Sequence, residues 1–221
     1  MEKLTGKYGL PLEVQFCKKC TMNNQRPSST VEFKQKADEK KRTLIFGADG
    51  ICEACRYAEQ KKSINWDDRH KELEELCNRF RRSDGRYDVV VPGSGGKDSV
   101  QAAHILKYKY NMNPILITWP PALYTDIGRR NFDAWLDAGF ANYTYNQNKK
   151  LHRFLTKNAF LNLGHPFQPF ILGQKNLAPR LSVLLDIPLV VFGENEAEYG
   201  NAIEDNEKPT IDPKYYSAEL S

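Results

Sequence analysis

The segment Ser94–Ser99 has residue types and an order that could bind a phosphate group. It reads S-G-G-K-D-S and closely follows Tyr87–Val91, an apolar, β-branched run typical of a buried strand. Gly95 and Gly96 permit a tight turn and let an anion approach the backbone. If a helix begins at Lys97, its first N–H groups point at that anion. We therefore predict a strand, a glycine turn and a helix start that together form a phosphate site.

The spacing of this loop differs from that of two common nucleotide-binding loops. A Walker A loop has Ser or Thr after its Lys, whereas Asp98 follows Lys97, and a dinucleotide loop needs a third glycine that this segment lacks. The order S-G-G-x-D-S resembles the pyrophosphate loop of ATP pyrophosphatases, which implies that it holds the β- and γ-phosphates of ATP. The alternative is a glycine turn without a ligand. The candidate ATP-binding residues here are Ser94, Gly95, Gly96, Lys97, Asp98 and Ser99.

Lys97 and Asp98 are the candidate catalytic residues of the loop. Lys97 and the loop N–H groups could stabilise the negative charge that grows on departing pyrophosphate, and Asp98 could hold Mg²⁺ or fix the loop. The resemblance to ATP pyrophosphatases implies that the loop serves the adenylation of a carbonyl oxygen, which turns a poor leaving group into a good one.

Four of the five cysteines form two C-x-x-C pairs that could bind a metal. Two such knuckles can complete a tetrahedral site of four thiolates for structural Zn²⁺, and they leave no position for a catalytic water. The segments 30–35 and 43–46 between the pairs read as two strands of a hairpin, so the region resembles a zinc ribbon. Redox-active dithiols are the alternative. The candidate metal ligands are Cys17, Cys20, Cys52 and Cys55.

The segments around the loop predict a parallel α/β sheet. Apolar runs beginning near positions 87, 114 and 141 alternate with segments of helical spacing, which favours right-handed βαβ units. The expected fold class is α/β, a twisted parallel sheet with helices on both faces that is Rossmann-like. The loop's resemblance implies an adenine nucleotide alpha hydrolase-like version, preceded by the zinc-ribbon module. We predict strands at 87–91, 114–119, 141–145 and 187–192, helices at 65–82, 97–110, 125–139, 151–163 and 176–186, and a loop at 166–173.

Other candidate ligands follow the strands, because ligands of such sheets bind at the carboxyl ends of the strands. Thr118 and Trp119 are candidates for the adenine side, although Trp119 could equally be a core or rim aromatic. Glu194, Glu196 and Glu198 alternate after the last strand and could hold Mg²⁺ or orient an amine, with a solvated acidic loop as the alternative.

Composition bounds the domain organisation and the class of partner. The 221 residues carry a net charge of +4, and the densest basic run contains acidic residues, so we expect no nucleic-acid partner. No apolar segment is long enough to span a membrane and no export signal is visible, so we expect no membrane insertion and a cytoplasmic location. We predict a zinc-ribbon-like module at 1–65, a connecting helix at 66–86 and an ATP-binding α/β domain at 87–221.

The cysteine pairs FCKKC and GICEAC, the loop PGSGGKDS and the later segment GENEAEYG make the chain similar to the N-acetyl sugar amidotransferases of bacterial surface-polysaccharide biosynthesis. These enzymes serve O-antigen or nonulosonic acid pathways. The resemblance implies that ATP adenylates the acetamido group of a nucleotide-activated or related sugar and that ammonia displaces AMP to give an acetamidino group. A separate glutamine amidotransferase subunit would supply the ammonia. Members of that family continue beyond the fourth strand, so we expect the α/β domain to be truncated at its C-terminus.

Two other functions are consistent with the same residues. A tRNA-modifying pyrophosphate-loop enzyme that thiolates a base would use the same adenylation, but the mild charge and the lack of a cysteine after Cys77 disfavour it. A zinc-ribbon protein whose shortened α/β domain binds a nucleotide or a partner without turnover is the non-catalytic alternative. The histidines show no metal or triad spacing, so we predict that they serve packing or the surface.

Overall fold

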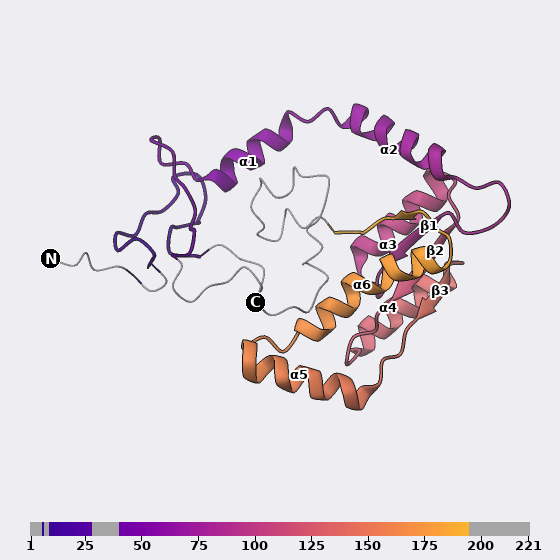
Figure 1. The fold of residues 1–221 in the computed structure, drawn as a ribbon. Helices are drawn as coiled ribbons and strands as arrows, with labels where there is room; N and C mark the ends of the chain where they lie inside the picture. Colours follow the sequence, from indigo (N-terminus) through magenta and orange to yellow (C-terminus); the bar gives the residue numbers. More distant parts are fainter. Residues whose placement is uncertain (1–5, 7–8, 28–39, 195–221) are drawn as a thin grey trace. The chain divides into compact units, whose positions relative to one another are not determined.

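The computed structural model describes residues 6, 9–27 and 40–194. The chain divides into two compact units, and the boundary lies between Arg69 and His70, within α2 (Trp66–Phe80). We call the described residues up to Arg69 the N-terminal unit and those from His70 onward the α/β unit (Figure 1). Each unit is described by itself.

The N-terminal unit is built from short antiparallel bridges and one helix. The bridges join Phe16 to Asn23, Pro27 to Thr43 and Phe46 to Cys52, and α1 (Glu53–Lys62) follows the last of them. The predicted strand at 43–46 is wrong as a continuous strand, because only its two end residues form bridges, to different partners. Its predicted partner at 30–35 lies outside the described residues.

The α/β unit contains a four-stranded parallel sheet, as the sequence predicts. Its strands are β1 (Val89–Pro92), β2 (Pro114–Thr118), β3 (Ala141–Thr144) and β4 (Leu189–Val190), in the order β3-β2-β1-β4. All three pairings are parallel. The central strands β1 and β2 are almost wholly buried, which is why they read as unbroken apolar runs in the sequence.

Helices cover both faces of this sheet, which confirms the predicted fold class. One face packs against α2, α3 (Lys97–His104), the π-helix η3 (Ile105–Lys109) and α4 (Asp126–Asp137). The other face packs against α6 (Gln168–Leu184), and α5 (Lys149–Leu163) lies beside α6 (Figure 1). Alternate strand residues divide between the two clusters: Val89 and Val91 belong to the first and Val90 to the second.

Two helices depart from the sequence-based boundaries. The predicted helix at 97–110 is α-helical only to His104 and continues as the π-helix η3. The predicted loop at 166–173 is wrong, because α6 begins at Gln168. Its Pro169 lies in the first turn, where a missing N–H costs no helical hydrogen bond, and Gly173 lies against the indole of Trp119.

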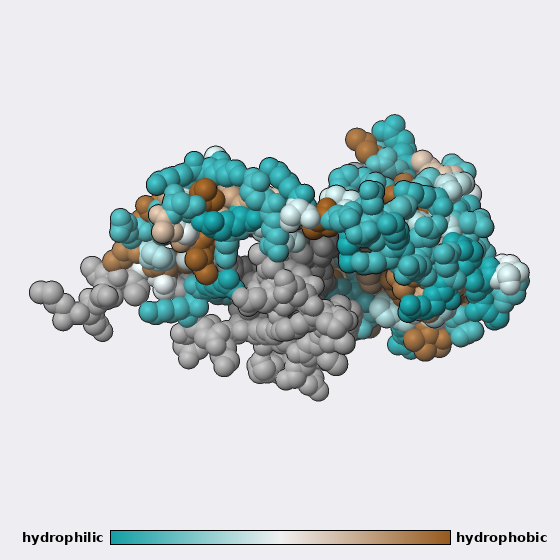
Figure 2. All heavy atoms as spheres, turned by 90° about the horizontal axis from the view of Figure 1, so that it is seen from above, coloured by the Kyte–Doolittle hydropathy of each residue, from teal (hydrophilic) through white to brown (hydrophobic). Residues whose placement is uncertain are grey.

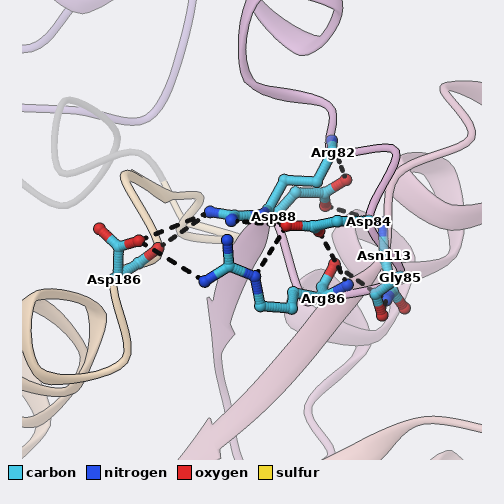
Figure 3. Close-up of polar contacts among 7 residues, drawn as sticks. All are labelled: Arg82, Asp84, Gly85, Arg86, Asp88, Asn113 and Asp186. Atoms are coloured by element: carbon cyan, nitrogen blue, oxygen red, sulfur yellow. Dashed lines mark hydrogen bonds and ion pairs between the residues drawn. The ribbon is translucent and has the colours of Figure 1, made fainter.

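A buried carboxylate fixes the amino ends of β1 and β2 (Figure 3). Asp88 is 1% exposed. Its Oδ1 accepts a hydrogen bond from Asn113 N at 2.7 Å, and its Oδ2 accepts one from Arg82 N at 3.2 Å. Asp84 adds a more exposed ion pair with Arg82 at 2.8 Å. Since Asp88 N also donates to Asn113 O at 3.1 Å, the two strands start in a fixed register.

The surface that Figure 2 shows is mainly hydrophilic, with apolar side chains in separate patches. Within the described ranges, no helix has the length and apolar character needed to span a bilayer.

Candidate functional site

The S-G-G-K-D-S loop has the backbone arrangement that the sequence predicts. β1 ends at Pro92, Gly96 caps α3 with φ −70° and ψ 148°, and the helix begins at Lys97. Gly95 has φ +92°, and a Cβ on it would lie 2.8 Å from the backbone N and Cα of Phe132. A side chain at this position would therefore strain the backbone and collide with α4, so the turn depends on glycine.

The outer part of the loop is open. Gly96 is exposed and a Cβ on it would meet no atom within 4 Å. The first N–H groups of α3 lack helical acceptors, as at any helix start, and carry the positive end of the helix dipole. Ser99 Oγ donates to Gly96 O at 3.0 Å, and Lys97 Nζ lies 2.6 Å from Asp98 Oδ1. The side chain of Lys97 is 87% exposed, so this cation can turn toward an arriving phosphate.

The loop lies at the switch point of the sheet. The chain adds β2 and β3 on one side of β1 and then returns to place β4 on the other side. In such sheets the ligand crevice is found at the carboxyl ends of the strands on either side of this reversal. Here those ends are the S-G-G-K-D-S loop after β1 and Gly193 after β4. A Cβ on Gly193 would lie 2.5 Å from Ser99 N and 2.6 Å from the Asp98 carbonyl carbon, so the end of β4 contacts the first turn of α3.

Glu194 is the described acidic residue of the segment after β4. It is exposed and directly follows Gly193, which brings it to the same edge of the sheet as Asp98. Carboxylates at this edge are suitable ligands for Mg²⁺ on a nucleotide. The predicted ligand Glu196 and its neighbour Glu198 lie outside the described residues.

Thr118 and Trp119 lie at the end of β2 with their side chains held by the fold. Thr118 is fully buried, and its Oγ1 accepts a hydrogen bond from Asn142 Nδ2 at 2.9 Å. The Trp119 indole stacks on Tyr145, with ring centroids 5.3 Å apart and 15° between the planes, and it contacts Gly173. The Thr118 hydroxyl is thus already engaged by Asn142, and the Trp119 ring is held between Tyr145 and the backbone of α6.

The four cysteines of the N-terminal unit converge on one point. Their sulfur atoms all lie within 4.8 Å of one another. Cys17 Sγ is 3.9 Å from Cys55 Sγ, and Cys20 Sγ is 3.7 Å from Cys52 Sγ. Four thiolates about 2.3 Å from a tetrahedral Zn²⁺ have sulfur–sulfur distances of about 3.8 Å. The donor set and its spacing therefore fit a structural zinc ion, and all five cysteines of the chain are free of disulfides.

Hydrogen bonds from the backbone stabilise negative charge in this cluster. The N–H groups of Lys19 and Cys52 donate to Cys17 Sγ at 3.4 and 3.3 Å. Burial by itself raises the pKa of Cys17, but the N–H donors of Cys52, Lys19 and Cys20 outweigh it and lower the pKa to about 6. Hydrogen bonding with Cys20 and burial raise the pKa of Cys55 to about 12. A metal cation in the centre would favour the thiolate form of all four cysteines.

Comparisons with known proteins give limited similarities. No family model matches the chain. An uncharacterized protein of Methanocaldococcus jannaschii is 32% identical over 77 residues, which span 35% of this chain and 27% of that protein. An NH3-dependent NAD synthetase from Campylobacter jejuni, solved in complex with nitrate, has a TM-score of 0.45 and 16% sequence identity. That match covers 62% of this chain and 59% of the synthetase chain.

Three residues shape this edge of the sheet, and of these only Gly193 lies in a segment that the sequence analysis singled out, GENEAEYG. Gly193 sets the contact between β4 and α3, Gly173 sets the contact between α6 and Trp119, and Asn142 engages Thr118. The position of Gly193, directly after the strand predicted at 187–192, could have indicated that it has a structural role. The contacts of Gly173 and Asn142 join elements that are distant in sequence, so no local sequence pattern indicates them.

Proposed function

We propose that the α/β unit binds ATP with Mg²⁺ at the S-G-G-K-D-S loop and converts the acetamido group of a nucleotide-activated or related sugar into an acetamidino group. The observation that supports this most directly is the position of the loop: an open glycine turn and helix start stand beside the end of β4, at the reversal of strand order. The resemblance of the loop and the cysteine pairs to N-acetyl sugar amidotransferases supplies the substrate.

The proposed conversion has two steps, adenylation of the amide oxygen and displacement of AMP by ammonia. The amide oxygen of the sugar attacks the α-phosphorus of ATP, the bond to the bridging oxygen breaks, and pyrophosphate leaves. Ammonia then attacks the activated carbon, the carbon–oxygen bond breaks, and AMP departs with the former amide oxygen while a proton is lost from nitrogen. The first step makes a good leaving group of an oxygen that ammonia cannot displace from an amide.

The residues of the loop have distinct roles in this scheme. The N–H groups of the first turn of α3 and the exposed Lys97 stabilise the charge on pyrophosphate as it leaves. Asp98, which holds Lys97 in the structure, would bind Mg²⁺ together with Glu194. Mg²⁺, when bound, would neutralise part of the negative charge on the phosphate oxygens. Ser99 fixes the turn through its hydrogen bond to Gly96 O.

The partners and pathway follow from the same resemblance. Ammonia would come from a separate glutamine amidotransferase subunit: Cys77 is fully buried, and the other four cysteines form the metal cluster. That cluster would hold a structural Zn²⁺ that cross-links the two knuckles. The product would enter surface-polysaccharide biosynthesis, O-antigen or nonulosonic acid, in the cytoplasm.

Incubation with ATP, Mg²⁺, ammonium and a panel of acetamido sugars tests the proposal. We expect AMP and pyrophosphate in equal amounts, dependent on both ammonium and one sugar, with a product mass that reflects replacement of oxygen by imino nitrogen. Asp98→Asn should abolish turnover, whereas Asp137→Asn, which changes an exposed carboxylate at the far end of α4, should not. ATP binding without pyrophosphate under any condition would favour a non-catalytic nucleotide-binding unit, and full turnover by Asp98→Asn would refute the loop assignment.

A further inference from the structure

The indole of Trp119 is clamped in a single orientation at the carboxyl edge of the sheet. It follows β2, and it stacks on Tyr145, which follows β3. A Cβ on Gly173 would lie 2.6 Å from its Cδ2 atom, so the backbone of α6 also touches the ring. Because strands of a parallel sheet end at a common edge, this indole lies at the same edge as the S-G-G-K-D-S loop.

Two neighbouring buried polar atoms at this position have no hydrogen-bond partner among the described residues. One is Trp119 Nε1 and the other is His152 Nε2, and the two rings are 6.4 Å apart between centroids. The other ring nitrogen of His152 faces Thr156 Oγ1 at 3.5 Å, on the same helix. A buried polar atom normally has a partner, since leaving it unpaired is costly.

Trp135 provides the contrast within the same unit. Its Nε1 is also buried without a partner in the described part of the chain, but the ring lies in the apolar cluster with Phe132 and Phe140. Its neighbours there offer no further unpaired polar atom. At Trp119, by contrast, the unpaired indole N–H belongs to a ring that lies near the His152 ring, which also has an unpaired nitrogen. Both rings lie at the edge of the sheet where ligands of such folds bind.

We propose that Trp119 Nε1 and His152 Nε2 bind the acceptor substrate, an uncharged group that accepts a hydrogen bond and carries a second polar atom, such as an acetamido group. The indole N–H donates to the carbonyl oxygen, and His152 pairs with the adjacent amide N–H or a hydroxyl. This inference rests on the proposed function and assigns its substrate-recognition residues.

Binding measurements on the full chain test this assignment. The probe is UDP-N-acetylglucosamine, titrated calorimetrically in the presence of saturating α,β-methylene-ATP, and UDP-glucose is the matched probe without the acetamido group. Trp119→Phe and His152→Phe should each weaken binding of the acetamido probe roughly tenfold, the loss expected for one hydrogen bond to a buried group. Both variants should leave binding of UDP-glucose within about twofold, and His152→Phe should leave binding of the ATP analogue within about twofold. Trp135→Phe is the control that removes the other unpaired indole N–H.

The outcomes separate this inference from the proposed function. If the wild-type chain binds the ATP analogue and the acetamido probe, but both variants bind the probe as tightly as wild type does, the unpaired atoms belong to the fold alone and the assignment is wrong. Failure of the wild type to bind the ATP analogue would instead refute the proposed function. If Trp119→Phe does not fold, the emission of Trp119 in a chain carrying Trp66→Phe and Trp135→Phe gives a second readout. That emission should change on addition of the acetamido probe and not of UDP-glucose, and an unchanged emission would overturn the assignment.

Discussion

Gly96→Ala separates the stability of the fold from the binding of a phosphate more cleanly than any other change in the loop. Gly96 is exposed, its φ of −70° is ordinary for alanine, and an added Cβ would meet no protein atom within 4 Å. The methyl group would instead occupy space beside the first N–H groups of α3. If phosphate oxygens approach these groups, alanine obstructs the ligand and leaves the folded chain unaffected.

Two small and opposed terms determine the stability of this variant. Alanine is a poorer N-cap than glycine by about 0.5–1 kcal/mol. Against this, alanine restricts the unfolded chain and stabilises the fold by about 0.4–1 kcal/mol where φ is compatible. The free energy of unfolding should therefore change by less than about 0.5 kcal/mol, while ATP affinity falls at least roughly tenfold because the phosphates can no longer reach the amides.

The adjacent Gly95 gives the opposite expectation and serves as the internal comparison. Alanine there would adopt a left-handed conformation at a cost of about 1–2 kcal/mol. Its Cβ would also lie 2.8 Å from Phe132 N and Cα, and overpacking of this kind costs about 1–3 kcal/mol. Gly95→Ala should thus destabilise the α/β unit by about 2–5 kcal/mol, the sum of the two terms.

Urea unfolding followed by tryptophan fluorescence, together with calorimetric titration of ATP and Mg²⁺, measures both properties for each variant. Trp119 and Trp135 lie in the α/β unit and report on its unfolding. Unaltered ATP affinity in a stable Gly96→Ala chain would show that no phosphate approaches this turn and would refute the reasoning.

Three further predictions concern the rest of the chain. The purified protein should contain about one zinc per chain; Cys55→Ser should lose it, Cys77→Ala should retain it, and a folded metal-free wild-type protein would contradict the assignment. Asp88→Ala should destabilise the α/β unit by about 3 kcal/mol because two backbone donors lose a charged acceptor, whereas Asp84→Ala, which removes partly exposed ion pairs with Arg82 and Arg86, should cost under about 1 kcal/mol for each pair. Burial raises the pKa of the Cys77 thiol, so the fold favours the protonated form. Stability against urea should therefore fall as the pH rises above about 8.5, the pKa of a cysteine in the unfolded chain. Cys77→Ala should remove this pH dependence, and an equal pH dependence in the variant would assign it to other groups.

The parallel sheet could be predicted because its determinants are local. β1 and β2 are short apolar runs, each followed by helical spacing, and the observed strands begin within two residues of the predicted positions 87 and 114. The glycine turn and the helix start at Lys97 were likewise readable, since they depend on residue types next to one another. The ligand of that turn is still a prediction.

Contacts between distant segments set the features that local patterns did not indicate. Residues 166–173 contain proline and glycine and therefore resemble a loop, yet Pro169 suits a first helical turn and Gly173 is needed where α6 meets Trp119. The strand at 43–46 is interrupted because its ends bridge to Pro27 and Cys52, near the cysteine knuckles. The interrupted strand follows from tertiary contacts and not from propensity, whereas Pro169 was a local signal for the start of α6.

Competition between pyrophosphate and ATP for the wild-type protein tests the central claim most directly. If the amides after β1 hold the β- and γ-phosphates, titrations should show one ATP bound per chain. Pyrophosphate should displace this ATP completely, and a titration with pyrophosphate alone should show a defined binding stoichiometry. ATP that stays bound at saturating pyrophosphate, or a chain that binds neither molecule, would contradict the account.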